Sequence, residues 1–294
     1  MTEKILITGI NGFIGSHCSN YFKSNGWDVY GIDIYGEQES NFIQGTVSLE
    51  KLLQFKQEFD VILHLAGSGS VGMVNKSPES ERLKTVKSSE ELLEYIQKYN
   101  KNAKLIYISS AAVYGNTHSN LIHESDEYAP ISEYGKHKVL VENAIINSDI
   151  NYHIVRLFSV YGEGLKKQVL WDFSNKLKNN INEPVINCFG TGAEERDFIH
   201  INDVISLINL VIKTNKNNLI INGGTGIPTT IRTIFNTLSD LFDYKGQLVF
   251  DNIISKDNPM KLVANIDNAK YLGFIPQIEI QKGLENYVEW FKEI

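Results

Sequence analysis

Tyr134 and Lys138 have the residue types and the spacing that acid–base chemistry requires. Positions four apart on a helix lie on one face, so the phenol and the ammonium are expected to be neighbours. A free tyrosine titrates at about pH 10, and a nearby cation is expected to lower the pKa of Tyr134. The pair Ser109-Ser110 ends a preceding strand and could place a hydroxyl on the same substrate oxygen. The tyrosine–lysine spacing alone is common on helices, but together these groups predict proton transfer at a substrate hydroxyl.

A glycine-rich loop near the start of the chain predicts the binding of a dinucleotide. The loop Thr-Gly-Ile-Asn-Gly-Phe-Ile-Gly contains Gly9, Gly12 and Gly15. It follows the apolar run 5–7, which indicates a strand, and precedes residues 16–22, which indicate a helix. Glycines allow a sharp turn, and the N-terminus of the helix then presents N–H groups to a pyrophosphate. A simple tight turn is the alternative, but it does not require this strand–turn–helix context.

Asp33 indicates which dinucleotide the loop binds. Residues 28–33 form an apolar run that ends on this acid, about 20 residues beyond the glycines. A carboxylate there accepts hydrogen bonds from a ribose 2′-hydroxyl and repels a 2′-phosphate, so NAD is favoured over NADP. A solvent-exposed acid at a strand end is the alternative.

The positive charge on the nicotinamide of NAD also favours the phenolate form of Tyr134. We therefore expect Tyr134 to transfer a proton while a hydride moves to or from the cofactor.

Composition and charge exclude several other classes of protein. The chain has 294 residues, a net charge of −7 and 42% hydrophobic residues, as an ordinary globular protein has. The negative charge and the lack of a basic stretch argue against nucleic acid as a partner. No apolar run is long enough to cross a membrane, and residues 1–8 resemble a strand rather than a signal sequence. Cys18, Cys188 and the histidines lack metal-ligand spacing, so we expect no metal and a reducing, cytoplasmic location.

Strand-like and helix-like segments alternate through the first half of the chain, which predicts a parallel sheet covered by helices on both faces. The expected fold class is therefore α/β, a Rossmann-type doubly wound parallel sheet with a smaller C-terminal α/β substrate lobe. Ligands in such sheets lie beyond the carboxyl ends of the strands, here after residues 8, 33, 65, 109 and 157. The other expected strands are 61–65, 105–109, 152–157, 185–189 and 219–222, and the other expected helices are 79–99, 134–147, 170–179, 201–213 and 282–292.

The regular alternation loosens after Tyr161, and this change predicts two domains. Residues 1–160 are predicted to form the NAD-binding Rossmann domain, and residues 195–222 are predicted to return to it. Residues 161–194 and 223–294 are predicted to form a substrate-binding lobe. The chain shows no repeat, no low-complexity tract and no long linker.

The chain resembles one known family, the extended short-chain dehydrogenases/reductases of the nucleotide-sugar epimerase/dehydratase group. The resemblance rests on motifs that occur in the family's order and cover nearly the whole chain. They are the glycine loop at 8–15, His64-Leu65-Ala66-Gly67, Ser109 to Gly115, Tyr134 to Lys138, Arg156 to Gly162, Phe189 to Gly192, Arg196 to His200, and Leu272-Gly273-Phe274 with Pro276. The resemblance implies an NAD-dependent enzyme that acts on a nucleotide-diphosphate sugar. It also implies a homodimer formed through a four-helix contact of residues 79–99 and 134–147.

The resemblance assigns roles to individual residues. Ser110, the third residue before the Val-Tyr-Gly element, matches the catalytic serine or threonine. Tyr134 matches the general acid/base, and Lys138 matches its electrostatic partner, which also holds the nicotinamide ribose. The implied cofactor contacts are Gly9, Asn11, Gly12, Phe13, Ile14, Gly15, Asp33, Leu65, Ala66 and Gly67, together with Tyr134 and Lys138. The implied substrate contacts are Ser68, Ala111, Ser159 and Arg196.

Arg196 is the cation that the resemblance places on the nucleotide diphosphate. A guanidinium fork matches phosphate oxygens, which supports this role. A structural ion pair with Asp197 or Asp203 is the alternative, because such pairs are common. His64 and His200 are expected to be structural histidines at strand ends, without a part in proton transfer.

Ala111 and Ala112 narrow the expected reaction. Sugar 4,6-dehydratases of this family usually carry Asp-Glu directly after the catalytic serine or threonine, where they remove a C5 proton and protonate the leaving hydroxyl. A methyl group exchanges no proton, so dehydration by that route is not expected here. The segment from His64 to Gly72 is most similar to UDP-galactose 4-epimerases. In those enzymes NAD⁺ oxidises the C4 hydroxyl, the 4-keto sugar turns over, and the hydride returns to its other face, so a 4-epimerase is expected.

Three positions depart from the family pattern. Ser159 and Thr85 stand where the family usually has asparagine, and Gly69 stands where the epimerases have lysine. The chain is also short for an epimerase, and short members are often 4-ketoreductases that act after a dehydratase. A nucleotide-4-keto-6-deoxy-sugar 4-reductase is therefore the first alternative. The second alternative is a catalytically silent dinucleotide-binding member, against which the intact serine, tyrosine and lysine argue.

Overall fold

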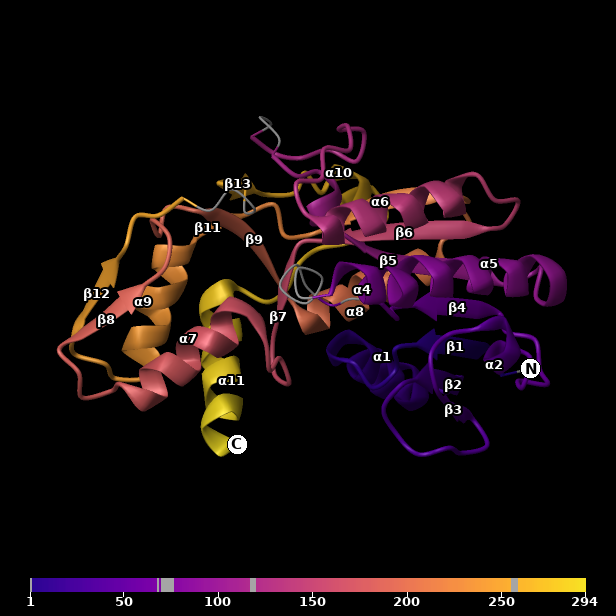
Figure 1. Ribbon diagram of the computed structural model, residues 1–294, viewed down its shortest axis with the longest axis horizontal. Helices are drawn as coiled ribbons and strands as arrows, with labels where there is room; N and C mark the ends of the chain where they lie inside the picture. The colour runs from indigo at the N-terminus through magenta and orange to yellow at the C-terminus, as the bar shows by residue number, and fades with distance from the viewer. Residues whose placement is uncertain (1, 68, 70–76, 117–119, 255–258) are drawn as a thin grey trace. The chain divides into compact units, whose positions relative to one another are not determined.

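The computed structural model describes residues 2–67, 69, 77–116, 120–254 and 259–294 (Figure 1). Within it the chain divides into two compact units. Unit 1 consists of Met1–Gly115, Glu127–Leu157 and Leu207–Ile221, and unit 2 consists of Asn116–Asp126, Phe158–Ser206 and Asn222–Ile294. Each unit is therefore built from three separate segments of the chain.

The centre of unit 1 is a seven-stranded sheet with the strand order β10-β6-β5-β4-β1-β2-β3. Its strands are β1 (Lys4–Thr8), β2 (Asp28–Asp33), β3 (Phe42–Gln44), β4 (Val61–His64), β5 (Lys104–Ser110), β6 (Tyr152–Leu157) and β10 (Leu219–Gly223). The strands from β6 to β3 pair in parallel. The order changes direction between β1 and β4, which is where doubly wound sheets bind their ligands. The Rossmann-type parallel sheet predicted from the sequence is confirmed.

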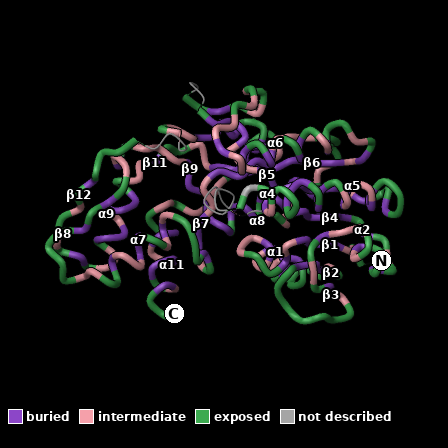
Figure 2. Tube along the Cα trace, viewed as in Figure 1, coloured by how far each residue is buried: buried purple, intermediate pink, exposed green. Residues whose placement is uncertain are grey.

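Helices bury the apolar residues of this sheet. The helical segments are α1 (Phe13–Ser24), α2 (Leu49–Leu52), α4 (Pro78–Arg82), η1 (Leu83–Lys87), α5 (Ser88–Tyr99), η2 (Ala111–Val113) and α6 (Glu133–Ile146), and α8 (Ile201–Lys213) runs into unit 1 from unit 2. One core cluster joins Leu92 and Ile96 of α5 and Val141 of α6 to Leu6 and Ile62 of the strands. Figure 2 shows β4, β5 and β6 as buried stretches, so the strand ends that carry the site rest on this core.

The helix predicted over residues 79–99 is interrupted. A π-helical turn, η1, separates α4 from α5. The hydroxyls of Ser88 and Ser89 donate to the carbonyl oxygens of Lys84 and Thr85, at 2.5 and 2.6 Å. Serine hydroxyls that bond the preceding turn of backbone compete with regular helix pairing. This competition accounts for a wider turn that the apolar periodicity did not predict.

Unit 2 combines small sheets with longer helices. Its strands are β7 (Ser159–Tyr161), β8 (Val185–Cys188), β9 (Glu195–His200), β11 (Pro228–Thr230), β12 (Gln247–Phe250) and β13 (Lys261–Leu262), and its helices are α7 (Gln168–Asn179), α9 (Ile231–Leu241), α10 (Asp267–Tyr271) and α11 (Ile280–Glu293). β9 pairs with β11, β13 and β7, and β12 pairs with β8. The rings of Phe173 and Phe235 stack with centroids 3.7 Å apart and join α7 to α9. Strands β7, β9, β11, β12 and β13 were not predicted, because most of them are too short to show periodicity.

The segment Asn116–Asp126 leaves unit 1 after η2 and belongs to unit 2. The backbone N–H of Ile122 donates to Val263 O at 2.8 Å. Glu124 accepts the backbone N–H of Asn222, also at 2.8 Å. The chain that joins β5 to α6 therefore passes through unit 2.

Candidate active site

The glycine-rich loop joins β1 to α1 by a turn that leaves no room for side chains. Gly9 has a φ of +72°, which glycine adopts without strain. A Cβ on Gly15 would lie 2.1 Å from the carbonyl oxygen of Gly9, so only glycine allows α1 to approach the turn this closely. Helix α1 begins after Gly12, with no side-chain cap and no acidic residue in its first turn. The positive end of its dipole is therefore available to an anion such as a pyrophosphate.

Asp33 ends β2 beside this loop and is 9% exposed. Its carboxylate accepts the backbone N–H of Asn11 at 2.9 Å and that of Tyr35 at 3.1 Å, one on each oxygen. A carboxylate has about four lone-pair sites, so acceptor capacity remains for ribose hydroxyls. The Asn11 side chain donates to Tyr35 O at 2.6 Å. Asp33, the residue predicted to bind the ribose, therefore also fixes the glycine loop to the end of β2.

The segment after β4 is held against the same loop by Thr8. The hydroxyl of Thr8 accepts the N–H groups of Leu65 and Ala66, at 3.2 and 3.1 Å, and lies 2.7 Å from Nδ1 of His64. Because this hydroxyl already accepts two N–H groups, its proton points to Nδ1, and Nε2 of His64 donates to Ser89 Oγ at 2.9 Å. Burial, with a smaller contribution from a neighbouring ammonium, lowers the pKa of His64 to about 3. The ring is therefore neutral at physiological pH.

Gly67 continues this segment with a φ of +133°. A Cβ there would lie 3.1 Å from Thr85 Oγ1, so the backbone of Gly67 packs directly on η1. A Cβ on Gly9 would lie 3.0 Å from the backbone nitrogen of Ala66, which places the two predicted cofactor-binding loops side by side. The predicted substrate contact Ser68 lies outside the described residues.

Ser110, Tyr134 and Lys138 are brought together at the end of β5. Ser110 is hydrogen-bonded to Tyr134, and its hydroxyl also accepts the backbone N–H of Ala112, the second residue of η2, at 3.2 Å. The Lys138 ammonium lies 5.9 Å from the centroid of the Tyr134 ring and donates to the carbonyl oxygen of Ile108 at 2.9 Å. A Cβ on Gly135 would lie 2.4 Å from a carbonyl oxygen of η2, so this glycine lets α6 approach the Ser110 segment closely.

The pKa of Tyr134 differs from the expectation. Burial raises it above its ordinary value, and the hydrogen bond with Ser110 opposes this effect. The expected decrease is not found in the protein alone, because burial is the larger effect and Lys138 directs its ammonium to a backbone carbonyl. Burial also lowers the pKa of Lys138 to about 8, although Glu142 raises it.

A buried ion pair lies beneath this group. Arg156 of β6 donates from Nη2 to Glu142 of α6 at 2.7 Å, and its Nε donates to the same carboxylate at 3.1 Å. Ser109 and Tyr128 donate their hydroxyls to this carboxylate, at 2.5 and 2.7 Å. The guanidinium lies 4.9 Å from the ring centroids of both Tyr114 and Tyr128. The pair thereby joins β5, β6, η2 and α6, the elements that carry or support the predicted catalytic residues.

Sequence reasoning gave no role to Thr8, Glu142 or Arg156. The signal for Glu142 was its position four residues after Lys138, on the same helical face. Arg156 was noted only as part of a motif. No pattern in the sequence pairs Arg156 with Glu142, because these residues belong to different elements.

The other predicted substrate contacts lie in both units. Ala111 is 1% exposed and begins η2 of unit 1. Ser159 begins β7 and Arg196 lies in β9, both in unit 2. Arg196 donates to the carbonyl oxygen of Glu195 at 2.8 Å, and burial lowers its pKa.

The structural alternative for Arg196 was an ion pair with Asp197 or Asp203. The carboxylate of Asp197 instead accepts the backbone N–H of Thr225 at 2.7 Å. Asp203 accepts the backbone N–H of Gln277 at 2.9 Å. In the described part of the chain, neither acid forms a salt bridge with Arg196, so its guanidinium is not committed to either of them.

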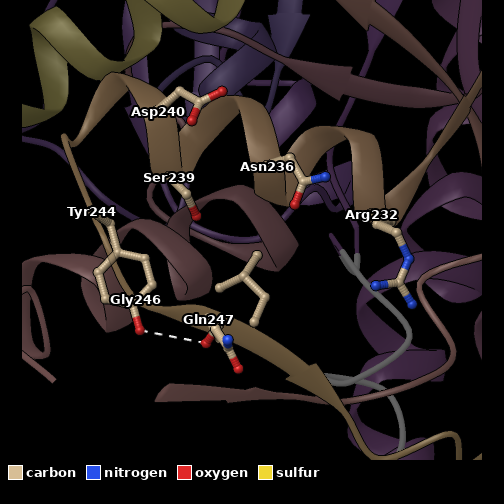
Figure 3. Close-up of a pocket in the computed structure, with 8 residues that line it drawn as sticks. Arg232, Asn236, Ser239, Asp240, Tyr244, Gly246 and Gln247 are labelled. Atoms are coloured by element: carbon tan, nitrogen blue, oxygen red, sulfur yellow. Dashed lines mark hydrogen bonds between the residues drawn. The ribbon is translucent and has the colours of Figure 1, made fainter. Parts of the chain in front are cut away.

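Unit 2 contains a pocket of its own. It has a volume of about 490 Å³, and Figure 3 shows α9 and the start of β12 around it. Arg232, Asn236 and Asp240 line its helical side, and Tyr244 and Gln247 line the opposite side. None of the predicted site residues lines this pocket. Within the described ranges there is no cluster of metal-ligating side chains, and no helix has the length and apolar character needed to cross a membrane.

Comparisons with known proteins agree with this geometry. Residues 5–224 match the NAD dependent epimerase/dehydratase family. A UDP-glucuronate 4-epimerase of Thermodesulfobacterium geofontis is 25% identical over 316 residues, covering 98% of this chain and 96% of that protein. The solved UDP-glucuronic acid 4-epimerase of Bacillus cereus, in complex with UDP-glucuronic acid and NAD, is 28% identical with a TM-score of 0.87. The UDP-glucose 4-epimerase of Thermotoga maritima, with UDP-glucose, is 26% identical with a TM-score of 0.88, and both structures match 99% of each chain.

The sheet topology and the glycine loop define a dinucleotide-binding protein of the Rossmann type. More particularly, the chain belongs to the NAD dependent epimerase/dehydratase family, whose match spans most of its length. The family predicted from the motifs is therefore confirmed, and so is NAD as the cofactor. The loop fits this cofactor, because α1 starts without a capping side chain and Asp33 retains acceptor capacity.

Proposed function

We propose that this protein is an NAD-dependent nucleotide-sugar 4-epimerase that acts through a transient 4-keto sugar. The observation that carries the proposal is the grouping of Ser110, Tyr134 and Lys138 in the unit that also holds the glycine loop and Asp33. Folding requires no such trio beside a dinucleotide-binding loop. The relatives from T. geofontis, B. cereus and T. maritima are named as 4-epimerases of UDP-sugars, which supports a UDP-sugar as the substrate.

In this proposal Tyr134 exchanges the proton of the sugar C4 hydroxyl. NAD, when bound, supplies reversible hydride acceptance at C4. Ser110 donates a hydrogen bond to the same sugar oxygen and remains in reach of Tyr134. Lys138 places a positive charge near the phenol, which favours the phenolate, and it also holds the nicotinamide ribose.

The substrate is proposed to contact Ser68, Ala111, Ser159 and Arg196. Arg196 would bind the diphosphate, because its guanidinium can donate two parallel hydrogen bonds to phosphate oxygens. Ala111 and Ala112 carry methyl groups where a dehydratase has its Asp-Glu pair, so the two positions directly after Ser110 supply no carboxylate for a dehydration step. We also propose that residues 1–160, with 195–222, form the NAD-binding Rossmann domain and that residues 161–194 and 223–294 form the substrate-binding lobe, although residues 116–126, 158–160 and 195–206 fall in unit 2 of the structure.

One observation separates the epimerase from a nucleotide-4-keto-6-deoxy-sugar 4-reductase. An epimerase retains NAD through its cycle, whereas a reductase must exchange it. We expect the purified protein to release NAD(H), detected by absorbance, when it is denatured. It should also interconvert a UDP-hexose and its C4 epimer without added cofactor. A protein that releases no dinucleotide, and that consumes added NADH or NADPH with a 4-keto sugar, would favour the reductase.

We further propose a cytoplasmic homodimer formed through α5 and α6, which lie side by side (Figure 1). Apolar side chains are exposed along these helices and η1: Leu83, Tyr99 and Leu140. Both cysteines are buried and free, which fits a reducing compartment. Sedimentation equilibrium at twice the chain mass would support the dimer, and a mass of one chain would contradict it.

A further inference from the structure

Glu142 is a fully buried carboxylate on α6, four residues after Lys138 and eight after Tyr134. This spacing places the phenol, the ammonium and the carboxylate in a row along one helical face. A buried charge is costly unless donors surround it. Arg156 and two hydroxyls, of Ser109 and Tyr128, all donate to Glu142, and this set of donors fits an ionised carboxylate.

The other groups that face Lys138 do not carry negative charge. The ring of Tyr107 on β5 lies 4.8 Å from the ammonium, and burial raises the pKa of this phenol well above its ordinary value. His64 on β4 is neutral, as its lowered pKa requires. Tyr134 on α6 has a raised pKa. Among the described residues that face Lys138, Glu142 is therefore the one that supplies a negative charge.

We propose that Glu142 is a positioning residue that keeps Lys138 in its ammonium form, while its bonds to Ser109 and Arg156 fix α6 against β5 and β6. This inference rests on the proposed function, in which Lys138 is the electrostatic partner of Tyr134. Arg156 supplies the counter-charge that makes a carboxylate tolerable at this depth. In this proposal the Arg156–Glu142 pair both stabilises the positive charge of Lys138 and holds α6 against the sheet.

The direction of the pH effect follows from the protonation states of two groups. The active form has Tyr134 deprotonated and Lys138 protonated. Well below the pKa of Lys138, nearly all molecules hold the ammonium, so the share of the active form does not depend on Glu142. Above that pKa, the dominant form has lost the Lys138 proton and carries as many protons as the active form, so the share of the active form stops rising and stays at a level set by the difference between the two pKa values. A variant without the Glu142 charge has a lower Lys138 pKa and reaches a lower level, so the ratio of the wild-type rate to its rate should grow as the pH rises.

The charge of Lys138 can be measured without reference to catalysis. In protein labelled with ¹³C-lysine, the Cε shift of Lys138, assigned with Lys138→Met, reports its titration midpoint. Glu142→Gln is expected to lower this midpoint by about one pH unit or more, because an opposite charge is lost. Glu133→Gln, on the exposed face of the same helix and paired with Lys136, is the matched control and should leave it unchanged. An unchanged midpoint in Glu142→Gln would overturn the inference.

Turnover gives the second measurement. The ratio of the wild-type rate to the Glu142→Gln rate is expected to grow about tenfold between about pH 6 and about pH 9, since one pKa unit is a factor of ten. Glu133→Gln should show a ratio near one throughout. A ratio for Glu142→Gln that is constant across this range would indicate a purely structural role and would overturn the inference.

Two further variants keep the test decisive. If Glu142→Gln does not fold, Glu142→Gln/Arg156→Gln leaves no unpaired buried charge, and its Lys138 midpoint is expected to lie below that of Arg156→Gln, because these two proteins differ only by the charge of Glu142. Tyr134→Phe, assayed alongside, separates the two proposals. Normal turnover in Tyr134→Phe would overturn the role that the proposed function gives to Tyr134, and this inference with it. Lost turnover in Tyr134→Phe, together with an unshifted Lys138 midpoint in the Glu142 variant, would overturn the inference alone.

Discussion

Two regions of unit 1 carry the predicted chemistry, one formed mainly by backbone groups and the other by side chains. Around Gly9, Gly15 and Asp33, the geometry depends on missing side chains and on backbone N–H groups that donate to one carboxylate. Around Tyr134 and Lys138, it depends on buried charges and hydroxyls from several elements. The first region can hold an anion with little help from the rest of the fold, because a helix N-terminus already has the required polarity.

The second region must keep a buried cation beside a half-buried phenol. Burial lowers the pKa of Lys138 and raises that of Tyr134, so it opposes the ionised form of both groups. Glu142 and Ser110 act against burial at these two positions. The geometry of the predicted cofactor-binding region is therefore set by the lack of room for side chains. In the predicted catalytic region, the protonation states of the side chains are set by burial and by neighbouring charges.

The largest effect is expected from removing one hydroxyl in the catalytic region. Tyr134→Phe keeps the ring and its packing, so the fold and the affinity for NAD should be nearly unchanged. Turnover should fall by roughly 10²–10⁴, the usual contribution of one positioned acid/base group. Steady-state rates with a UDP-sugar and titration with NAD measure both quantities. Tyr271→Phe, at an exposed position on α10, is the control, and near-normal turnover in Tyr134→Phe would contradict the role of Tyr134 as the acid/base.

The second prediction concerns stability in the same region. Arg156→Met leaves the buried carboxylate of Glu142 without its counter-charge, and this should reduce the free energy of unfolding by about 3–5 kcal/mol. Lys136→Met removes the exposed partner of Glu133 and should cost at most about 1 kcal/mol. Urea denaturation of both variants measures the two effects. Equal losses would mean that burial does not distinguish the two ion pairs.

The smallest effect is expected in the cofactor-binding region. NAD(H) should bind more tightly than NADP(H) by about 2–3 kcal/mol, because a 2′-phosphate would meet the carboxylate of Asp33. Asp33→Asn should narrow this difference, whereas Asp28→Asn, at the exposed start of the same strand, should not. Fluorescence titration with both dinucleotides measures it. Equal or tighter binding of NADP(H) by the wild type would contradict the assignment and favour a reductase.

Many elements of the fold could be predicted from local pattern. The predicted segments 28–33, 152–157 and 201–213 coincide with β2, β6 and α8, because continuous apolar runs and helical periodicity are properties of short windows. Strand β3 was not predicted, since it has only three residues. The π-helical turn within the predicted helix 79–99 was also missed, because it depends on which carbonyl oxygens the serine hydroxyls reach.

The sequence by itself determined the family, the parallel sheet and the dinucleotide loop. These depend on residue types at fixed, short spacings, such as Gly9 to Gly15. Such a spacing is a property of a short segment and does not depend on how the rest of the chain folds. Only the tertiary structure decided that Arg156 meets Glu142 beneath the predicted catalytic residues. It also decided that the pKa of Tyr134 is raised rather than lowered. Burial and ion pairing are set by segments that meet only after folding, so no local pattern of residues contains them.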